Sequence, residues 1–326
     1  MNIVLFSSGY LASEIAQFLI QQYKQKVYNS FYLVTKPDKP KGRGLRSYPN
    51  IIKKTILEIL PSFQNNILEF DSFKKIDPSK KAENIDQLRS ILSLTDIAIC
   101  CDLGLIIPSD WLGLPKIFIN IHPSLLPLYR GPSPIQYTLL NGDSLTGITI
   151  CLVSEKVDQG DIICQSVIKI DPNDNFLTLR DKLSMLALEE LKKFIYLYNH
   201  SRVYFIKQND SISSYTRKIN DTLIDLSKSV IEVHNQVRAF YPDGYIYVNL
   251  GSDKKRIKIL KTAVVKNDNF DYSKFRKMDI FWIYGKRIFI GKEGENNLLE
   301  VFELQLEGRK VMDAGSFING YQRYIN

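Results

Sequence analysis

Short apolar segments alternate with amphipathic ones through the first 200 residues, and this alternation limits the possible folds more than any other feature of the sequence. Residues 96–102, DIAICCD, form a nearly continuous apolar run, which is typical of a parallel strand covered on both faces. Segments 146–153 and 161–170 are rich in β-branched residues and are expected to pair with each other. The remaining segments read as strands at 2–7, 27–35 and 117–121 and as amphipathic helices at 11–22 and 176–199. The alternation predicts an α/β fold with a doubly wound, Rossmann-like N-terminal domain.

The last third of the chain has a different pattern. Residues 204–226 are polar and aperiodic, as expected of a linker, and residues 228–241 read as a helix. Five short strand-like segments follow, separated by turn residues: GYIYVNL, KRIKILKTAVV, MDIFWIYG, RIFIG and LLEVFELQLEG. This pattern predicts a smaller C-terminal β-barrel of the OB-like type. The expected organisation is a catalytic domain at 1–203, a linker at 204–226 and a barrel at 227–326.

Composition and motif spacing argue against several classes of protein. No run approaches the ~20 apolar residues that a membrane-spanning helix requires, and the N-terminus lacks a secretory pattern. The four cysteines show no C-x-x-C spacing, so we expect reduced thiols and no metal site. The G-x-G-x-x-G fingerprint is absent, which argues against NAD as a cofactor. We expect a cytoplasmic protein with no membrane partner, for which a monomer suffices; an organelle matrix is the alternative location.

The stretch NIHPSLLPLYRGPSPIQ at residues 120–136 is the most informative motif in the chain. Asn120 and His122 end an apolar strand and lie two residues apart, so both side chains point to the same face. The following loop contains four prolines, which restrict its backbone and suit a rigid pocket edge. Downstream, the sequence VDQGD places Asp158 in a polar turn between two apolar strands.

An amide, an imidazole and a carboxylate together suit acyl transfer to an amine. The Asn120 amide could donate a hydrogen bond to a carbonyl oxygen as negative charge grows on it. His122 can exchange protons near neutral pH. Asp158 could orient the imidazole, stabilise its cation or bind a water that relays the proton. A buried histidine that only packs in the core is the alternative for His122, but the surrounding loop favours a functional site. His200 and His234 have no comparable setting, and His234 is interpreted as structural.

This stretch resembles the Asn-x-His-x-Ser-Leu-Leu-Pro signature of the folate-dependent formyltransferases, and especially of those that act on methionyl-tRNA. The resemblance implies 10-formyltetrahydrofolate as co-substrate. It also implies that the catalytic residues are Asn120, His122 and Asp158, and that the residues contacting folate are Ser124, Leu125, Leu126 and Pro127. Later segments, YTRKIND and EVFELQLEGRKVMDAGSFINGY among them, resemble the C-terminal part of the same family, so the match covers nearly the whole chain.

A basic segment distinguishes the formyltransferases that act on methionyl-tRNA from their relatives. Residues 35–46 read TKPDKPKGRGLR, and seven basic residues against one acid lie between Lys36 and Lys54. By resemblance this loop reaches the acceptor end of tRNA, with Lys41, Arg43 and Arg46 as the predicted contacts. A solvated charged turn is the alternative. The net charge of +8 is compatible with a polyanionic partner but does not identify one.

The chain departs from the family pattern at two places. FSSGY follows the first strand where the family commonly has Phe-Ala-Gly-Thr-Pro, and Leu45 and Arg46 replace the usual Lys-Lys after the GRG. The first departure concerns the acceptor pocket, and the second removes one positive charge from the expected tRNA contact.

The sequence therefore predicts an enzyme that transfers the formyl group of 10-formyltetrahydrofolate to the α-amino group of methionyl initiator tRNA, for translation initiation. Three alternatives remain. The first keeps the chemistry but uses an amino-sugar nucleotide as acceptor. The second, glycinamide ribonucleotide as acceptor, leaves the second domain without a purpose. The third is an RNA-binding module whose catalytic domain has decayed, which the retained Asn, His and Asp argue against.

Overall fold

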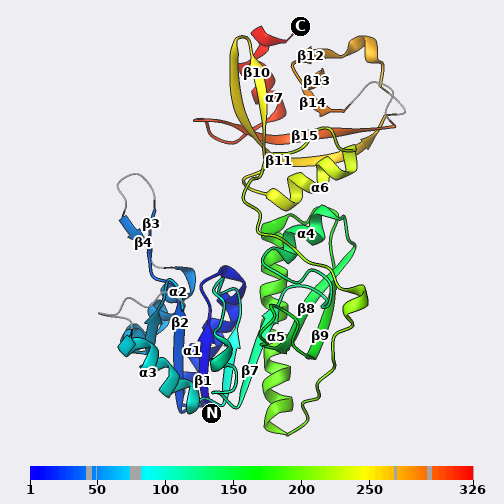
Figure 1. Cartoon of the computed structure of the whole chain (residues 1–326). Helices are drawn as coiled ribbons and strands as arrows, with labels where there is room; N and C mark the ends of the chain where they lie inside the picture. Colours follow the sequence, from blue (N-terminus) through cyan, green and yellow to red (C-terminus); the bar gives the residue numbers. More distant parts are fainter. Residues whose placement is uncertain (42–45, 49, 74–81, 268–269, 292–295, 326) are drawn as a thin grey trace. The chain divides into compact units, whose positions relative to one another are not determined.

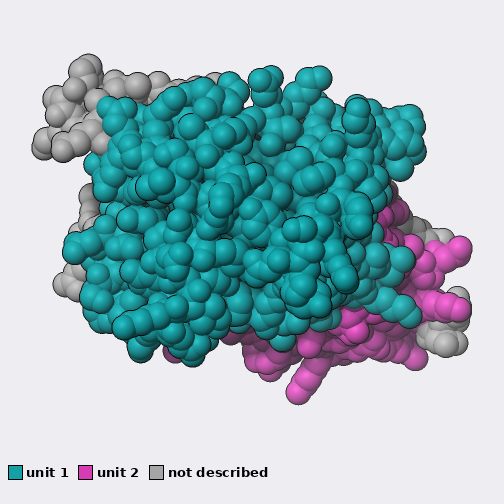
Figure 2. Space-filling view, turned by 90° about the horizontal axis from the view of Figure 1, so that it is seen from below, with its two compact units in different colours: residues 1–134, 145–169, 180–217 teal, residues 135–144, 170–179, 218–326 magenta. Residues whose placement is uncertain are grey.

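The structure is a computed structural model that describes the chain except residues 42–45, 49, 74–81, 268–269, 292–295 and 326. The chain forms two compact units, which are coloured separately in Figure 2. Unit 1 comprises Met1–Pro134, Leu145–Lys169 and Arg180–Arg217, and unit 2 comprises Ile135–Ser144, Ile170–Leu179 and Lys218–Asn326. The predicted domain boundaries remain a prediction.

A seven-stranded sheet forms the centre of unit 1, in the order β5-β2-β1-β6-β7-β8-β9 (Figure 1). Its strands are β1 (Asn2–Phe6), β2 (Ser30–Thr35), β5 (Ile67–Glu69), β6 (Ile97–Cys100), β7 (Ile117–His122), β8 (Leu145–Leu152) and β9 (Ile162–Lys169). The pairs from β5 to β7 are parallel, whereas β7–β8 and β8–β9 are antiparallel. The sheet confirms the predicted α/β class and the predicted pairing of the two β-branched segments.

Helices cover this sheet because its strands are apolar on both faces. Val4 and Phe6 pack in a buried cluster with Leu88 and Leu92 of α3. The residues that alternate with them in β1 are equally buried and therefore point to the opposite face. The helices of unit 1 are α1 (Ser13–Lys24), α2 (Ile51–Ile59), α3 (Ala82–Ser93) and α5 (Phe176–Asn199, from Arg180 onward), with short 3-10 turns at Tyr10–Ala12, Pro61–Asn66, Ser109–Trp111 and Asp210–Ile212. No helix within the described ranges is long and apolar enough to cross a membrane.

Unit 2 is built on an antiparallel sheet in the order β10-β11-β15-β14-β13-β12, with β16 paired to β15. The strands are β10 (Tyr245–Leu250), β11 (Asp253–Lys266), β12 (Arg276–Met278), β13 (Phe281–Tyr284), β14 (Arg287–Ile290), β15 (Asn297–Leu306) and β16 (Met312–Asp313). Its helices are most of α4 (Pro134–Leu140), α6 (Val230–Phe240) and α7 (Ala314–Gly320), with 3-10 turns at Tyr272–Lys274 and Gln322–Tyr324. Ser229 and Glu232 form a capping box that fixes the start of α6.

The prediction of five strands in this unit is wrong, because the described residues form seven. The segment MDIFWIYG, predicted as one strand, contains a tight turn between β12 and β13. Asp279 lies in that turn with a left-handed φ of 53°, which aspartate tolerates better than most residues. Met278 and Phe281 therefore pair across the hairpin instead of following one another along a strand. The two-residue strand β16 is too short to give an alternating pattern.

His234 in α6 gives unit 2 a pH-dependent contribution to stability. Its Nδ1 lies 2.8 Å from Thr262 Oγ1, and burial, reinforced by the Arg238 charge, lowers the pKa of His234 to about 4. The unfolded chain takes up this proton near pH 6.5, whereas the folded protein takes it up only near pH 4. Stability is therefore fully present above about pH 6.5 and is lost as the pH falls toward 4.

We predict that a His234→Gln variant loses less stability than the wild type between pH 7 and pH 5. The measurement is the urea midpoint of unfolding at each pH. His200→Gln is the matched control, since His200 is exposed, and it should follow the wild type. Equal pH dependence in the wild type and the His234 variant would contradict the assignment.

Candidate active site

Strand β7 places Asn120 and His122 at the carboxyl edge of the parallel part of the sheet, where sites of this fold class gather. The two residues point to the same face because they are two apart in a strand. Asn120 pairs with Cys100 of β6 on one side and Cys151 of β8 on the other, so its backbone position is fixed from both sides. Asp158 lies in the loop that joins β8 to β9.

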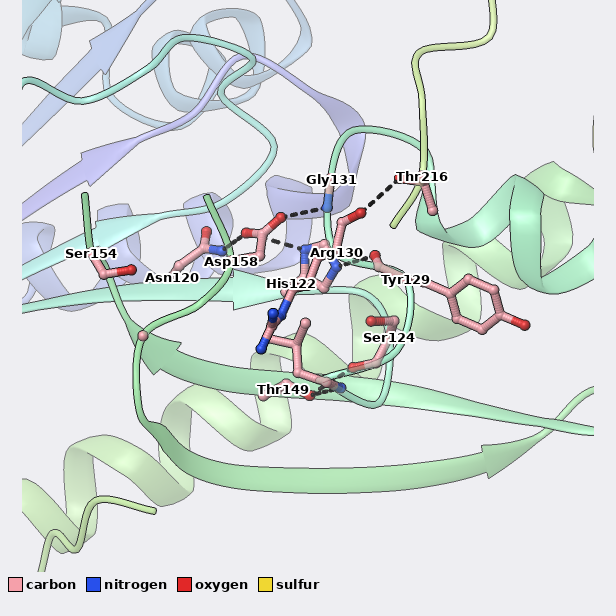
Figure 3. Close-up of polar contacts among 12 residues, drawn as sticks. Asn120, His122, Ser124, Tyr129, Arg130, Gly131, Thr149, Ser154, Asp158 and Thr216 are labelled. Carbon is pink, nitrogen blue, oxygen red and sulfur yellow. Dashed lines mark hydrogen bonds and ion pairs between the residues drawn. The ribbon is translucent and has the colours of Figure 1, made fainter. Parts of the chain in front are cut away.

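The Asp158 carboxylate joins these residues, as Figure 3 shows. Its Oδ1 accepts a hydrogen bond of 2.8 Å from Asn120 Nδ2 and lies 3.6 Å from His122 Nδ1. Its Oδ2 accepts a bond of 2.7 Å from the backbone N–H of Gly131. Only 8% of the Asp158 side chain is exposed, so the carboxylate depends on these partners. The structure thus brings together the three side chains that were predicted to be catalytic, and their catalytic roles stay a prediction.

The hydrogen bonds of His122 identify the nitrogen that can act as a base. Its Nε2 lies 2.9 Å from the backbone carbonyl of Tyr129. A carbonyl oxygen only accepts, so Nε2 carries a proton and the neutral ring has its lone pair on Nδ1. Nδ1 faces Asp158. A proton taken up there produces a cation beside a carboxylate, which stabilises it.

Left-handed backbone conformations shape both loops around this site. Tyr129 has φ 61° and Asp158 has φ 57°. This conformation costs about 1–3 kcal/mol in a residue such as tyrosine unless neighbouring groups hold it, and aspartate tolerates it better. Gly131 has φ 109°, a conformation that favours glycine. A Cβ at Gly131 would also lie 2.7 Å from the backbone oxygen of Thr216. Glycine is therefore required where the backbone N–H reaches Asp158.

Sequence reasoning missed two backbone groups of this site, the Tyr129 carbonyl and the Gly131 amide. Every residue except proline carries both groups, so no residue pattern marks those that bind a catalytic side chain. The Arg-Gly pair at 130–131 is the available signal, because a glycine inside a proline-rich loop indicates a special backbone conformation.

The four residues predicted to contact folate lie in the loop directly after β7. The side chains of Ser124 and Leu126 are buried, at 0% and 3% exposure. Ser124 Oγ donates to the Leu128 carbonyl at 2.6 Å, and Leu126 N donates to Thr149 Oγ1 at 3.1 Å. These two residues therefore stabilise the loop itself.

Leu125 and the cis-bonded Pro127 are partly exposed and can offer apolar surface to a ligand. Contact with folate stays a prediction for all four residues.

The predicted tRNA-binding segment contains a short β-hairpin, which the charged sequence did not indicate. Strands β3 (Lys39–Lys41) and β4 (Arg46–Tyr48) pair antiparallel, with Lys41 opposite Arg46. Arg43 lies outside the described residues. Contact of Lys41, Arg43 and Arg46 with tRNA stays a prediction.

The cysteines near the site do not supply a reactive thiolate. Cys100 adjoins Asn120 across the sheet, and burial, with the negative charges of Asp158 and Asp102, raises its pKa to about 12. It is therefore a neutral thiol at pH 7. Within the described ranges, no group of three or more His, Cys, Asp or Glu side chains is placed to hold a metal ion.

Comparison with known proteins identifies the family of the chain. Residues 1–194 match the family model described as formyl transferase, and residues 218–322 match the model described as formyl transferase, C-terminal domain. The chain belongs to the formyl transferase family. The first match contains Asn120, His122 and Asp158, and the second contains most of unit 2.

Curated relatives in this family resemble the chain over its whole length. A methionyl-tRNA formyltransferase from Leptospira interrogans is 32% identical over 329 residues, covering 99% of this chain and 98% of the relative. One from Ehrlichia canis is 33% identical, covering 98% and 97%. One from Buchnera aphidicola is 31% identical, covering 99% and 94%.

Solved structures of formyltransferases share the fold. The structure of WlaRD, a sugar 3N-formyl transferase with dTDP and 5-N-formyl-THF, has a TM-score of 0.64 at 20% identity and covers 95% of this chain and 99% of its own. The N-formyltransferase of Helicobacter canadensis with folinic acid and dTDP-3-aminofucose has a TM-score of 0.63 at 19% identity, covering 92% and 98%. At these identities the likeness concerns the fold alone.

We predict that Asp158→Asn lowers turnover by at least about 100-fold, since the variant keeps the size of the side chain but removes the charge beside His122. Glu155→Gln is the matched control, because it removes one charge from an exposed position of the same loop. The measurement is the rate of formyl transfer by purified proteins with equal circular dichroism spectra. Turnover near that of the wild type in the Asp158 variant would show that its charge takes no part.

Proposed function

We propose that the protein transfers the formyl group of 10-formyltetrahydrofolate to the α-amino group of methionine on initiator tRNA, for translation initiation. The observation that carries the proposal is the full-length similarity, at 31–33% identity, to methionyl-tRNA formyltransferases of several bacteria. The position of Asn120 and His122 beside the Asp158 carboxylate also supports the proposal, because an amide, an imidazole and a carboxylate together suit acyl transfer to an amine.

In the proposed reaction the methionyl amine attacks the formyl carbon directly. A free α-amino group has a pKa near 8, and that of its ester is lower, so much of the amine is neutral at pH 7. Strong base activation is unnecessary, and the enzyme must chiefly orient the reactants and stabilise the oxyanion. An amide nitrogen carries two hydrogens, and Asn120 donates one to Asp158. We assign the second to the formyl oxygen, where one good donor is worth about 3–4 kcal/mol.

His122 then moves the proton that the amine loses. As the new C–N bond forms, Nδ1 of His122 accepts this proton, and Asp158 at 3.6 Å stabilises the imidazolium. Collapse of the tetrahedral intermediate breaks the bond between the formyl carbon and N10 of folate. N10 receives the proton, so the products are formylated methionyl-tRNA and tetrahydrofolate. Leu125 and Pro127 are proposed to hold the folate beside this carbon.

The tRNA partner is proposed to contact the basic hairpin through Lys41, Arg43 and Arg46. The positive charge of this segment supports the assignment, and binding through phosphates should weaken as salt concentration rises.

We further propose that the sheet of unit 2 closes as an OB-like barrel in a domain at 227–326, joined by a linker at 204–226 to a catalytic domain at 1–203. All three proposed catalytic side chains come from one chain, so a monomer is sufficient for the proposed chemistry. We also propose a cytoplasmic location.

A labelling experiment tests this function. Purified protein is mixed with 10-formyltetrahydrofolate labelled in the formyl group and with either methionyl initiator tRNA or a dTDP-amino sugar. We expect label on the tRNA-bound methionine and at most trace label on the sugar. Label on the sugar alone would overturn the proposed acceptor, and label on neither acceptor would overturn the proposed transfer.

A further inference from the structure

We propose that Gln208 is a positioning residue that holds the Asp158 loop in its catalytic conformation, a role that deepens the proposed formyl transfer and rests on it. Gln208 lies in the segment predicted to be a linker. Its Nε2 donates to the backbone carbonyls of Asp158 and Gly160, both at 2.8 Å. Its Oε1 accepts from Arg130 Nε at 3.0 Å and from Nη2 at 2.7 Å. One side chain therefore connects the two loops that surround the site.

Arg130 fixes the orientation of the Gln208 amide. Its side chain is 1% exposed, and a buried guanidinium must be paired. Asp210 accepts from Nη2 at 2.7 Å but is 76% exposed, and the Tyr215 hydroxyl accepts from Nη1 at 2.8 Å. Gln208 takes two of the guanidinium bonds through its oxygen, which leaves the amide N–H groups facing the Asp158 loop. A flipped amide would place like groups against each other at both ends.

The same segment also supports the loop that follows β7. Arg130 N donates to the Ser214 carbonyl at 2.9 Å, and Thr216 N donates to the Arg130 carbonyl at 2.7 Å. Tyr129 N donates to Ser214 Oγ at 2.8 Å. Tyr129 is the residue whose carbonyl binds His122. Gln208, Ser214 and Thr216 therefore contact the two loops around the site, whereas the Asp210 side chain contacts the Arg130 guanidinium.

Loss of Gln208 should act on the geometry of Asp158. That residue lies in a loop, in a left-handed conformation, and the bonds from Gln208 hold its backbone carbonyl and that of Gly160. Without the two bonds from Gln208 Nε2, the loop can relax and move the carboxylate away from Asn120 and His122. The expected effect falls on kcat, because a displaced catalytic group impairs the transition state more than the binding of folate or tRNA.

The experiment compares Gln208→Ala and Gln208→Glu with the control Asp210→Asn. Gln208→Glu keeps an acceptor for Arg130 but turns an oxygen toward the two loop carbonyls, so it separates the loop contact from the pairing of the buried charge. Asp210→Asn alters the same guanidinium network, and within the described part of the chain the Asp210 side chain makes no hydrogen bond to the Asp158 loop. We expect both Gln208 variants to lose about 10- to 100-fold in kcat with little change in KM for either substrate, and the control to stay within about threefold of the wild type.

A second readout does not depend on the acceptor. Hydrogen–deuterium exchange of the backbone amides in residues 155–161 should be faster in both Gln208 variants and unchanged in Asp210→Asn. Wild-type kcat and exchange in both Gln208 variants would overturn the proposal, as would equal losses in the control. A wild-type protein that formylates no methionyl-tRNA would contradict the proposed function, while the exchange measurement would still decide the role of Gln208.

Discussion

The buried carboxylate of Asp158 is the interaction on which the site depends. One oxygen holds the Asn120 amide and faces the His122 ring, and the other holds the Gly131 backbone N–H. A charge this well covered needs each of its donors, because burial without them costs several kcal/mol. The same requirement that stabilises the carboxylate brings the proposed oxyanion donor, the proposed base and the proposed charge stabiliser to one point. Stability and chemistry therefore share the same hydrogen bonds.

The partners of Asp158 come from strand β7 and from the loop that follows it, and the fold determines where they meet. Strand β7 delivers Asn120 and His122 to the carboxyl edge of the sheet. The proline-rich loop after β7 supplies the Tyr129 carbonyl, which contacts His122, and the Gly131 amide, which donates to Asp158. Residues 208–216 then lie along this loop and tie it to the loop of Asp158. The site is thus a junction of three segments on a rigid strand end.

The sequence predicted those parts of the fold that have a local pattern. Helix α5 begins and ends where the periodicity placed it, and strands β8 and β9 pair as their β-branched residues indicated. Asn120 and His122 could be recognised because both side chains come from one strand face. The contacts of Gln208 could not be predicted, since they join residues up to 78 positions apart through backbone carbonyls and a buried arginine. The turn at Asp279 was missed because the apolar run continues through it.

A crystal structure with an unreactive analogue of 10-formyltetrahydrofolate tests the central claim most directly. The account predicts the formyl oxygen about 3 Å from Asn120 Nδ2, with the formyl carbon facing Nδ1 of His122 and the Asp158 carboxylate still between the two side chains. A formyl group bound away from these atoms, or a carboxylate displaced from Asn120 and His122 when the analogue is bound, would contradict it.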